Sequence, residues 1–362
     1  MMKLLYITFI DMNDAPSTGS SVRPLKMLEA FEALGVEVVT VSGMNNNLKA
    51  RKKAVKEIKN KLKTWTPDLC YIEPPTGPFF YHGDVGLVKY IHRKGIPMSI
   101  FYRDAYWKYP EYYINKDTPK IDVLKHKVIK CMQQHQWNVF KKTMDIIYFP
   151  SLTMANEFDF ENKKILPPGS FVPDFTEKTT LSDPLTFIFV GGAAKNHGTH
   201  LTLEAFEKVN SDKVRAKVTY ICPKEQWDGL GIDKEKYSEW LDIVHASGSA
   251  LTPYYEKSDV ALLTAPKTFY RDFAVPIKVF EYCSYLKPML VTNCTETARI
   301  VNDNHAGWVT DDNVESVCER IIHICENPDE VLNIRDNMKE ARDNNLWINR
   351  AKQVIEDLKR NK

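Results

Sequence analysis

Residues 275–292 have the sequence VPIKVFEYCSYLKPMLVT, and this stretch carries more information about the fold than any other. Pro276 is expected to open a helix, the pair Lys287-Pro288 to end it, and the apolar run that follows to form a strand. A helix N-terminus at a sheet edge offers unbonded amides and a positive dipole end, which suit a diphosphate. Glu281, about one turn into the helix, suits the vicinal hydroxyls of a ribose. The stretch therefore predicts a nucleotide-sugar site, with an ordinary surface helix as the alternative.

Short apolar runs alternate with helical patterns along the rest of the chain. The strand-like runs are 4–10, 36–41, 69–72, 98–102 and 146–149 in the first half, and 185–190, 216–222, 241–245, 260–264, 289–292 and 307–310 in the second. The helical patterns are 23–34, 48–64, 83–94, 120–143, 198–210, 234–239, 277–285, 313–326 and 328–343. Such alternation implies βαβ units and parallel sheets. We therefore expect an α/β protein with two Rossmann-like domains and a ligand cleft at the carboxyl ends of the strands.

The domain boundaries follow from length and local composition. A chain of 362 residues is too long for a single core and suits two domains of ordinary size. Residues 167–184 are rich in Pro, Ser, Thr and Asp, which is typical of a linker. We expect a first domain at 1–172, a linker at 173–184, a second domain at 185–343 and a charged terminal helix within 344–362.

Composition is that of a soluble globular protein, with 43% hydrophobic and 27% charged residues. No apolar run approaches the roughly 20 residues that a membrane helix needs. Seven cysteines without a Cys-x-x-Cys pair argue for a reducing compartment and against a zinc or disulfide framework, so we expect a cytoplasmic protein. His197 and His200 have the i, i+3 spacing of metal ligands, but no third ligand lies nearby in the sequence. A metal site is therefore not expected.

The net charge of +2 is unevenly distributed between the two halves. Residues 1–170 contain 25 basic and 17 acidic residues, a net charge of +8, and the remainder has a net charge of −6. The helical patterns at 48–63 and 120–142 are rich in lysine, and the second interleaves lysines with aliphatic and aromatic residues. A basic amphipathic helix predicts contact with an anionic membrane surface, here on the inner face of the cell membrane. A solvated helix face is the alternative, and no nucleic-acid-binding motif is present.

Candidate ligand-binding residues in the first half follow the expected strands. The polar loop after the first strand has only one glycine, so it is not a dinucleotide-binding fingerprint. The fourth strand ends in Arg103-Asp104, and an acid at that edge of a parallel sheet is well placed as a general base or as an acceptor for a substrate hydroxyl. An Arg103–Asp104 ion pair that closes the loop is the alternative. A nucleotide-sugar site implies a second substrate, the acceptor of the sugar. We expect this acceptor to contact Gly19, Ser20, Arg23, Glu73, Arg103 and Tyr106.

The second half begins with a strand that ends in a glycine turn. Gly191-Gly192 follow the run FIFV and precede a helical pattern. Glycines at a strand end let phosphate oxygens approach the backbone amides, and Lys195 would supply a positive charge. This turn is a second candidate for the diphosphate.

Five segments of the second half together resemble, in order, the donor domain of the GT-B glycosyltransferases, in particular glycosyltransferase family 4 (group 1). They are Val190-Gly191-Gly192, Leu203-Glu204-Ala205-Phe206, the stretch from Pro253 to Val260, the stretch from Pro276 to Thr292, and Ala306-Gly307-Trp308. In the first half, Phe149-Pro150-Ser151-Leu152 and the stretch from Ile165 to Gly169 resemble that family's last N-terminal strand and its entry to the second domain.

The resemblance implies a nucleoside-diphosphate sugar as donor and a pair of glutamates eight positions apart. Glu281 matches the second glutamate, which binds the donor ribose, whereas the first position is occupied by Phe273. The family's N-terminal histidine has no counterpart, and Asp104 follows the corresponding strand. The resemblance also implies that the terminal helix packs back on the first domain.

We therefore expect a glycosyltransferase that moves a sugar to an acceptor hydroxyl, on a lipid-linked or polysaccharide acceptor in envelope glycan synthesis. No metal or cofactor is expected, and retention is favoured with inversion left open. The expected catalytic residue is Asp104. The expected donor-binding residues are Gly191, Gly192, Lys195, Pro276, Ile277, Lys278, Val279 and Glu281. The alternatives are a nucleotide-sugar epimerase or hydrolase of the same fold, and a non-catalytic two-lobed binding module.

Overall fold

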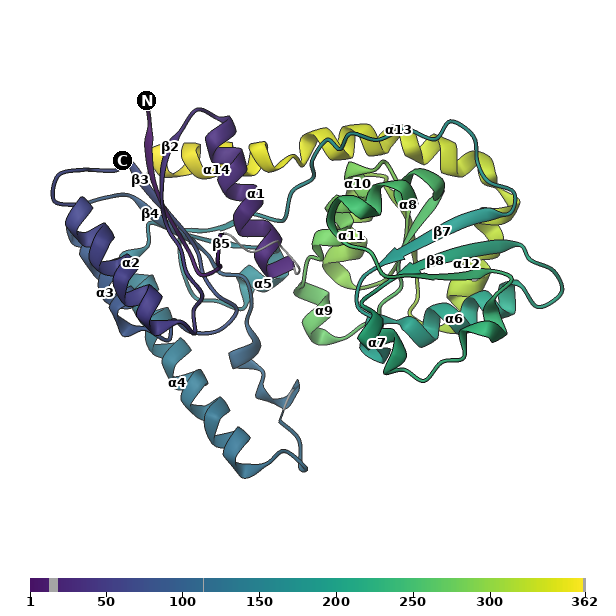
Figure 1. The fold of residues 1–362 in the computed structure, drawn as a ribbon, viewed down its shortest axis with the longest axis horizontal. Coiled ribbons are helices and arrows are strands. Elements are labelled where there is room, and N and C mark those ends of the chain that lie inside the picture. The colour runs from purple at the N-terminus through teal and green to yellow at the C-terminus, as the bar shows by residue number, and fades with distance from the viewer. Residues whose placement is uncertain (13–18, 113, 361–362) are drawn as a thin grey trace. The chain divides into compact units, whose positions relative to one another are not determined.

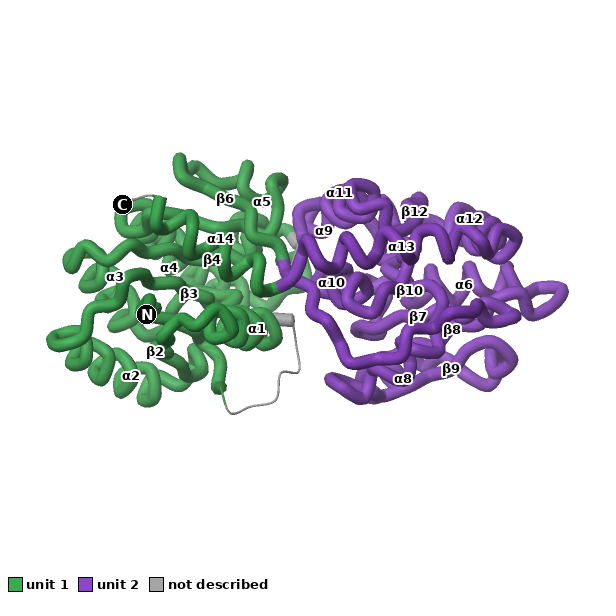
Figure 2. The backbone as a smooth tube through the Cα atoms, turned by 90° about the horizontal axis from the view of Figure 1, so that it is seen from above, with its two compact units in different colours: residues 1–167, 347–362 green, residues 168–346 purple. Residues whose placement is uncertain are grey.

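Two parallel sheets of six strands each organise the chain into two units (Figures 1 and 2). The computed structural model describes residues 1–12, 19–112 and 114–360. Unit 1 contains residues 1–167 and 347–362, and unit 2 contains residues 168–346. The predicted α/β class with two Rossmann-like sheets is confirmed.

The sheet of unit 1 has the strand order β2-β1-β3-β4-β5-β6, and its apolar strands are mostly buried on both faces. Its strands are β1 (Lys3–Thr8), β2 (Glu37–Val41), β3 (Leu69–Glu73), β4 (Met98–Phe101), β5 (Ile146–Phe149) and β6 (Lys163–Ile165). Its α-helices are α1 (Gly19–Ala33), α2 (Leu48–Lys61), α3 (His82–Arg93), α4 (Lys120–Thr143), α5 (Leu152–Asn156) and α14 (Trp347–Arg360). The short 3-10 helix η1 (Tyr106–Lys108) follows β4.

The sheet of unit 2 has the strand order β12-β11-β10-β7-β8-β9. Its strands are β7 (Leu185–Val190), β8 (Ala216–Ile221), β9 (Leu241–Val244), β10 (Val260–Leu263), β11 (Met289–Thr292) and β12 (Gly307–Thr310). Its α-helices are α6 (Thr199–Val209), α7 (Lys224–Asp228), α8 (Thr252–Lys257), α9 (Phe269–Phe273), α10 (Ile277–Ser284), α11 (Thr295–Asp303), α12 (Val314–Glu326) and α13 (Pro328–Asn344).

Alternate residues of β7 serve two hydrophobic clusters in unit 2. Phe187 and Phe189 lie in the cluster that includes residues of α6 and α12. Ile188 and Val190 lie in the cluster that includes residues of α10 and α13. Successive side chains of a strand point to opposite faces of the sheet. Helix α10 therefore packs on the face to which Ile188 and Val190 point, opposite to α6 and α12.

The chain divides at residues that differ from the expected ones. Unit 2 begins at Pro168, so the expected linker 173–184 is part of that unit. Phe171 and Phe175 contact the ring of Tyr285 edge-on, and Lys178 forms an ion pair with the buried Asp259 at 2.6 Å. The Pro-rich composition of this segment therefore reflects an extended, packed chain and not a free linker.

The terminal helix α14 is part of unit 1 and packs against α1. The hydroxyl of Tyr148 on β5 donates to Asp357 at 3.0 Å, and Gln353 donates to the carbonyl oxygen of Ile165 at 2.9 Å. None of the described helices is long and apolar enough to cross a membrane.

Candidate functional site

The strand order of each sheet identifies where a ligand is expected to bind. In unit 2, β8 and β9 lie on one side of the first strand β7, while β10, β11 and β12 lie on the other. In unit 1, β2 lies on one side of β1, and β3 to β6 lie on the other. The direction of chain winding thus reverses next to β7 and next to β1. In open parallel sheets, ligands bind at the carboxyl ends of the strands beside such a reversal.

The glycine turn of unit 2 follows β7 at this position. A Cβ on Gly192 would lie 2.9 Å from Oε1 of Gln226 and 3.1 Å from Nε2 of His197. The same Gln226 oxygen accepts a hydrogen bond from the amide of Ala193 at 3.0 Å. The turn is therefore held between two polar side chains, and glycine leaves its backbone accessible to a small anion.

A second glycine fixes the chain just after the turn. Gly198 has a φ of +84°, and a Cβ there would lie 2.0 Å from the carbonyl oxygen of Thr264 at the end of β10. Only glycine fits this contact. The contact holds the segment of Lys195–His197 against the neighbouring strand.

Positive charge gathers at this turn. Lys195 is exposed, and the guanidinium of Arg271 on α9 donates to the carbonyl oxygen of Asn196. Burial, reinforced by the nearby charge of Arg271, lowers the pKa of His197 below its ordinary value. His197 is therefore a neutral hydrogen-bonding group near pH 7, and Lys195 and Arg271 carry the charge.

Glu281 lies on α10 with both carboxylate oxygens engaged. Oε1 accepts a hydrogen bond from the hydroxyl of Tyr255 at 2.7 Å, and Oε2 forms an ion pair with Nζ of Lys278 at 2.7 Å. The Tyr255 ring stacks on Tyr285 at 4.1 Å, so this partner is rigid. The Glu281 side chain keeps 18% of its surface exposed, which leaves its remaining lone pairs open to a ligand hydroxyl.

Tyr282 ties α10 to the glycine turn. Its hydroxyl accepts a hydrogen bond from the amide of Val190 at 3.2 Å and donates to the carbonyl oxygen of Leu262 at 3.1 Å. Since Val190 directly precedes Gly191, the residue next to Glu281 is bonded to the strand that ends in the turn. The structure thus joins the helix that carries Glu281 to the strand that ends in the glycine turn.

The first turn of α10 differs in one detail from the expected arrangement. The amides of Ile277 and Lys278 belong to the first turn, where helix amides have no intrahelical acceptor. The amide of Val279 donates to the carbonyl oxygen of Pro276 at 3.2 Å, and its side chain is buried in the core. Val279 therefore supports the helix and offers no amide to a ligand.

The position expected for a first glutamate is apolar. Phe273 is 1% exposed and packs edge-on against Tyr270 at 4.7 Å. Oδ1 of the adjacent Asp272 accepts hydrogen bonds from the amide and hydroxyl of Thr295, both at 2.8 Å. Asp272 therefore binds the first residue of α11 and does not replace the missing glutamate.

The candidate site of unit 1 is a cavity of about 440 Å³ between β1 and β3. It is lined by the segments that follow three strands: Thr8 to Asp11 after β1, Met44 to Asn46 after β2, and Glu73 to Gly77 at the end of β3. Ser21 and Pro24 of α1, Phe80 before α3 and Arg103 after β4 complete its lining. The predicted residues Glu73 and Arg103 thus meet at this cavity.

A buried ion network holds the floor of the cavity. Glu73 is 0% exposed and accepts hydrogen bonds from Nε of Arg23 at 2.9 Å, the hydroxyl of Tyr71 at 2.6 Å and Nη2 of Arg103 at 3.3 Å. The guanidinium of Arg23 also lies 3.4 Å from the ring centroid of Phe101. Arg23 was expected to contact the acceptor substrate, but the structure buries it against Glu73. Two of the predicted acceptor residues therefore neutralise each other.

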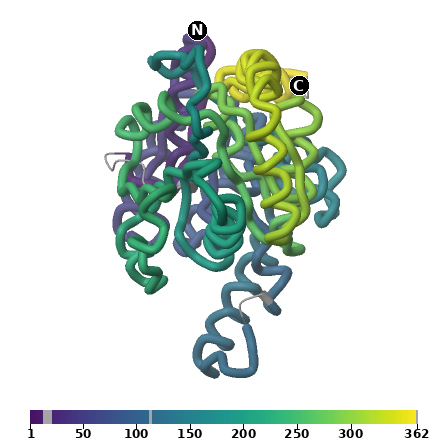
Figure 3. Tube along the Cα trace, turned by 90° about the vertical axis from the view of Figure 1, so that its right-hand side faces the viewer, coloured from purple at the N-terminus to yellow at the C-terminus, as the bar shows by residue number. Residues whose placement is uncertain are grey.

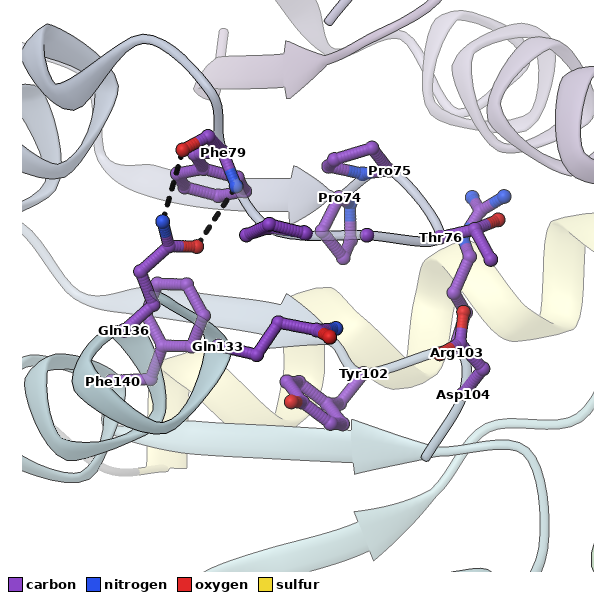
Figure 4. A pocket seen from close by; sticks show the side chains of 12 residues that line it. Pro74, Pro75, Thr76, Phe79, Tyr102, Arg103, Asp104, Gln133, Gln136 and Phe140 are labelled. Carbon is purple, nitrogen blue, oxygen red and sulfur yellow. Dashed lines mark hydrogen bonds between the residues drawn. The ribbon is translucent and has the colours of Figure 1, made fainter. Parts of the chain in front are cut away.

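Asp104 lies beside the cavity in a narrow pocket with Tyr102, Gln133 and the proline-rich loop at 74–78 (Figure 4). It is 7% exposed, and neither carboxylate oxygen has a well-formed hydrogen bond within the described part of the chain. Burial raises the pKa of Asp104 to about 7, against the smaller lowering by the Arg103 charge and the Tyr106 amide. The alternative of a closing ion pair is not observed, because Arg103 pairs with Glu73.

The position of the proline-rich loop is fixed from α4. The side-chain amide of Gln136 accepts a hydrogen bond from the amide of Phe79 at 2.8 Å and donates to its carbonyl oxygen at 3.0 Å (Figure 4). Of the other predicted residues, Tyr106 begins η1 and is 43% exposed. Gly19 and Ser20 are the first residues of α1, and their surroundings lie outside what the structure describes.

Several supporting residues could not have been selected from the sequence. Tyr255 and Gln226 lie 26 and 33 residues from the groups they bind, and only the sheet brings them together. The spacing of His197 and His200 in the sequence suggested a metal ligand, whereas in the structure the His197 ring lies against Gly192 and supports the glycine turn. No group of three metal-ligating side chains occurs among the residues that the structure describes.

Comparison with known proteins gives a family match within unit 2 and solved structures of the same fold. Residues 184–327 match the family described as Glycosyl transferases group 1. A glycosyltransferase from Rickettsia africae has a TM-score of 0.68 at 12% identity, over 99% of this chain and 98% of that one. Anabaena HepE in complex with UDP gives 0.65 at 10% identity, over 99% and 100% of the two chains. WaaG, a glycosyltransferase involved in lipopolysaccharide biosynthesis, gives 0.63 at 13% identity, over 97% and 98%.

The structural likenesses show the GT-B fold, and the family match covers most of unit 2. A search of curated proteins found no match. The sequence-based recognition is confirmed to this extent: residues 184–327 match group 1 glycosyltransferases and the whole chain has the GT-B fold, which supports sugar transfer as its activity.

Proposed function

We propose that this glycosyltransferase binds a uridine-diphosphate sugar on unit 2 and transfers the sugar to the hydroxyl of a lipid-linked or polysaccharide acceptor on unit 1. The observation that supports the donor site is the anchoring of α10: Tyr255 holds the carboxylate of Glu281, and the neighbouring Tyr282 accepts a hydrogen bond from Val190, the residue before the glycine turn. The UDP and UDP-glucose complexes of Anabaena HepE support UDP as the nucleotide.

In this proposal Glu281 accepts hydrogen bonds from the donor ribose. Tyr255 and Lys278 hold its carboxylate in place, so little ordering is needed when the donor binds. The amides of Gly192, Ile277 and Lys278 donate to the diphosphate. Lys195, Lys278 and the newly recognised Arg271 balance its charge, which is the reason to propose transfer without a metal ion.

Asp104 is the proposed group at the acceptor hydroxyl. A carboxyl with a pKa of about 7 can exchange a proton near neutral pH, as a general base must. Its oxygens have no strong hydrogen-bond donor to release before a substrate hydroxyl binds. In an inverting transfer Asp104 would take the hydroxyl proton. In a retaining transfer, which the family resemblance favours, it would orient that hydroxyl.

The cavity next to Asp104 supports a bulky acceptor. Its volume of about 440 Å³ is within the range of small-molecule sites, and it offers both apolar and polar side chains. Asn46 would provide an amide group for sugar hydroxyls and Phe9 an apolar wall, while Asn45 holds the backbone of Pro78 and Phe80. We propose cytoplasmic envelope glycan synthesis as the setting of the reaction.

A thermal-shift panel of UDP-, GDP- and dTDP-sugars tests the donor assignment. UDP-sugars should raise the melting temperature of the wild type, and Glu281→Ala should remove that rise. Product analysis with and without an added acceptor then tests transfer. Release of free sugar or of an epimer at the same rate without acceptor would contradict the proposal.

A further inference from the structure

Two buried glutamines lie three residues apart on helix α4. The first half of α4 extends beyond the sheet and the other helices of unit 1, and its second half, which carries Gln133 and Gln136, packs against the unit (Figures 1 and 3). Gln133 is 8% exposed and Gln136 is 6% exposed. Buried amide groups are normally hydrogen-bonded, so each of these side chains is expected to have a polar partner.

The two glutamines differ in their partners. Gln136 exchanges two hydrogen bonds with the backbone of Phe79 and so holds the proline-rich loop. Gln133 forms no side-chain hydrogen bond within the part of the chain that the structure describes. The position of the loop therefore accounts for Gln136, whereas the presence of a polar side chain at Gln133 needs another reason.

Gln133 lines the narrow pocket that also contains Asp104. Figure 4 shows its side-chain amide extending from α4 towards the end of β4, on the side where Asp104 lies. Both carboxylate oxygens of Asp104 are buried and have no hydrogen-bond partner among the described residues. Two polar groups with unused hydrogen-bonding capacity therefore face the same pocket.

The narrow pocket has room for one water molecule. Its volume is about 20 Å³. A bound water needs roughly 10–15 Å³, whereas a site for a sugar ring is far larger. The Asp104 carboxyl and the Gln133 amide would supply at least two of the hydrogen bonds that a buried water normally makes.

The proposed acceptor cavity adjoins the narrow pocket. The lining residues that the two have in common are Pro74, Pro75, Thr76, Gly77 and Arg103. Gln133 lines the narrow pocket and does not line the acceptor cavity. It therefore lies where it can act on Asp104 without contacting the acceptor, as a positioning residue does.

We propose that Gln133 positions Asp104 for sugar transfer, through one water molecule held between the two side chains. The side-chain carbonyl oxygen of Gln133 accepts a hydrogen bond from this water, and the water donates its other hydrogen to the Asp104 carboxylate. The second hydrogen bond favours the charged carboxylate over the neutral acid and fixes its orientation towards the acceptor hydroxyl. The inference rests on the role proposed for Asp104 and adds a residue of α4 to it.

Few other groups act on the charge of Asp104. Burial raises its pKa to about 7, and the charge of Arg103 and the amide of Tyr106 on η1 lower it by less. Tyr102 is neutral near pH 7, because burial raises its pKa further. Arg103, itself paired with Glu73, is the one other charged residue in the described lining of the pocket. Loss of a hydrogen bond to the Asp104 carboxylate should therefore be visible in its titration.

Infrared titration of the full chain tests this proposal without donor or acceptor. Protonated carboxyl groups have their own absorption band, and the part of this band that is absent from Asp104→Asn reports on Asp104. In the wild type this part should disappear with a midpoint near pH 7. Gln133→Met keeps the length of the side chain and removes its polar atoms. It should raise the midpoint by about one pH unit, as expected for one lost hydrogen bond to a charge.

The matched control is Gln134→Met, the same change at the neighbouring exposed position of α4, which should leave the midpoint unchanged. Gln133→Asn keeps an amide and should raise the midpoint less than half as far as Gln133→Met. In transfer assays the pH profile of kcat should move with the infrared midpoint. Unchanged circular dichroism and UDP binding will verify that each variant is folded.

Two results would overturn the inference while the role of Asp104 stands. One is a midpoint in Gln133→Met equal to that of the control. The other is a crystal structure of the wild type without a water molecule within hydrogen-bond distance of both side chains. A wild-type midpoint near pH 4 would overturn the inference and the role of Asp104 together.

Discussion

At the residue scale, the most informative contrast is between two buried acids of unit 1. Glu73 is surrounded by Arg23, Arg103 and the Tyr71 hydroxyl, so its charge is fully compensated. Asp104, which directly follows Arg103 in the chain, has no comparable partners, and burial raises its pKa to about 7. Compensated buried charges are costly to break because the remaining partner is left unpaired, whereas uncompensated ones with shifted pKa values are typical of reacting groups.

Asp104→Asn is expected to stabilise the protein while it impairs transfer. The folded-state pKa is raised from 3.8 to about 7, so the stability that Asp104 contributes is complete below pH 4 and is lost as the pH rises through 7. At pH 8 the variant should therefore gain about 2 to 4 kcal/mol in the free energy of unfolding. Urea unfolding at pH 5 and pH 8 measures the gain, which should shrink at the lower pH.

The Asp104→Asn substitution should lower turnover, although it raises stability. If Asp104 acts at the acceptor hydroxyl, wild-type kcat should rise with pH through about 7, and the variant should be slow at every pH. The half-exposed Asp122 on α4 offers a control, since Asp122→Asn should alter neither quantity. Full turnover in Asp104→Asn with intact donor binding would remove the proposed role.

Glu73→Gln is expected to destabilise unit 1. The amide keeps an acceptor oxygen but leaves two buried guanidinium groups without a counter-charge, which costs roughly 3 kcal/mol. Urea unfolding at pH 7 measures the loss. Glu29→Gln breaks the exposed pair with Lys26 and should leave stability nearly unchanged. Equal stability of both variants would contradict the role given to Glu73.

At the element scale, the donor site depends on short turns held by glycine. Gly198 combines a positive φ with close approach to the carbonyl oxygen of Thr264, and this fixes the residues after the Gly191-Gly192 turn against β10. Gly231 has a similar φ of +64° but no atom within 4 Å of its Cβ position. The two glycines thus separate the effect of backbone strain from that of a steric clash.

Gly198→Ala should cost about 3 kcal/mol in the free energy of unfolding, and Gly231→Ala about 1 kcal/mol, the ordinary cost of a left-handed alanine. The excess in the first variant measures the clash with β10, and UDP affinity should fall with it. Chemical unfolding of both proteins provides the comparison. Equal costs at the two positions would mean that the contact with Thr264 is not tight.

Many of the helices, strands and turns could be predicted from the sequence. The helix at 277–285 and the turn at Gly191-Gly192 have local signals, a proline start and a glycine pair after an apolar run, and both are present. Strand β6 was not predicted because it has three residues, two of them lysines. Helices α9 and α11 were not predicted either, since their nine or fewer residues give a weak helical period.

At the scale of the whole molecule, sequence reasoning reached the two-unit architecture but not its side-chain networks. The strands could be predicted because a strand that is buried on both faces has a continuous apolar run, and these runs alternate with helical patterns along the chain. The Arg23–Glu73–Arg103 network joins residues 30 and 50 positions apart, and the helix period could not tell which half of α4 packs. These features depend on tertiary packing, which has no local signal.

Helix α14 joins the end of the chain to unit 1, and its removal should affect the two units differently. Ala351, Val354 and Leu358 are fully buried, so a chain that ends at Leu346 would expose their contact surface on unit 1. Calorimetry should show that the transition of unit 1 is lost or strongly lowered while that of unit 2 persists. An unchanged transition for unit 1 would contradict the assigned role of α14.

Titration calorimetry with UDP, paired with turnover, tests the central claim that Glu281 and the glycine turn form the donor site. Glu281→Ala should weaken UDP binding by about 10- to 100-fold, as expected for the loss of charged hydrogen bonds to the ribose. Asp104→Asn should bind UDP like the wild type yet lose transfer. If Glu281→Ala bound UDP as tightly as the wild type, the donor site would lie elsewhere and the account of unit 2 would be wrong.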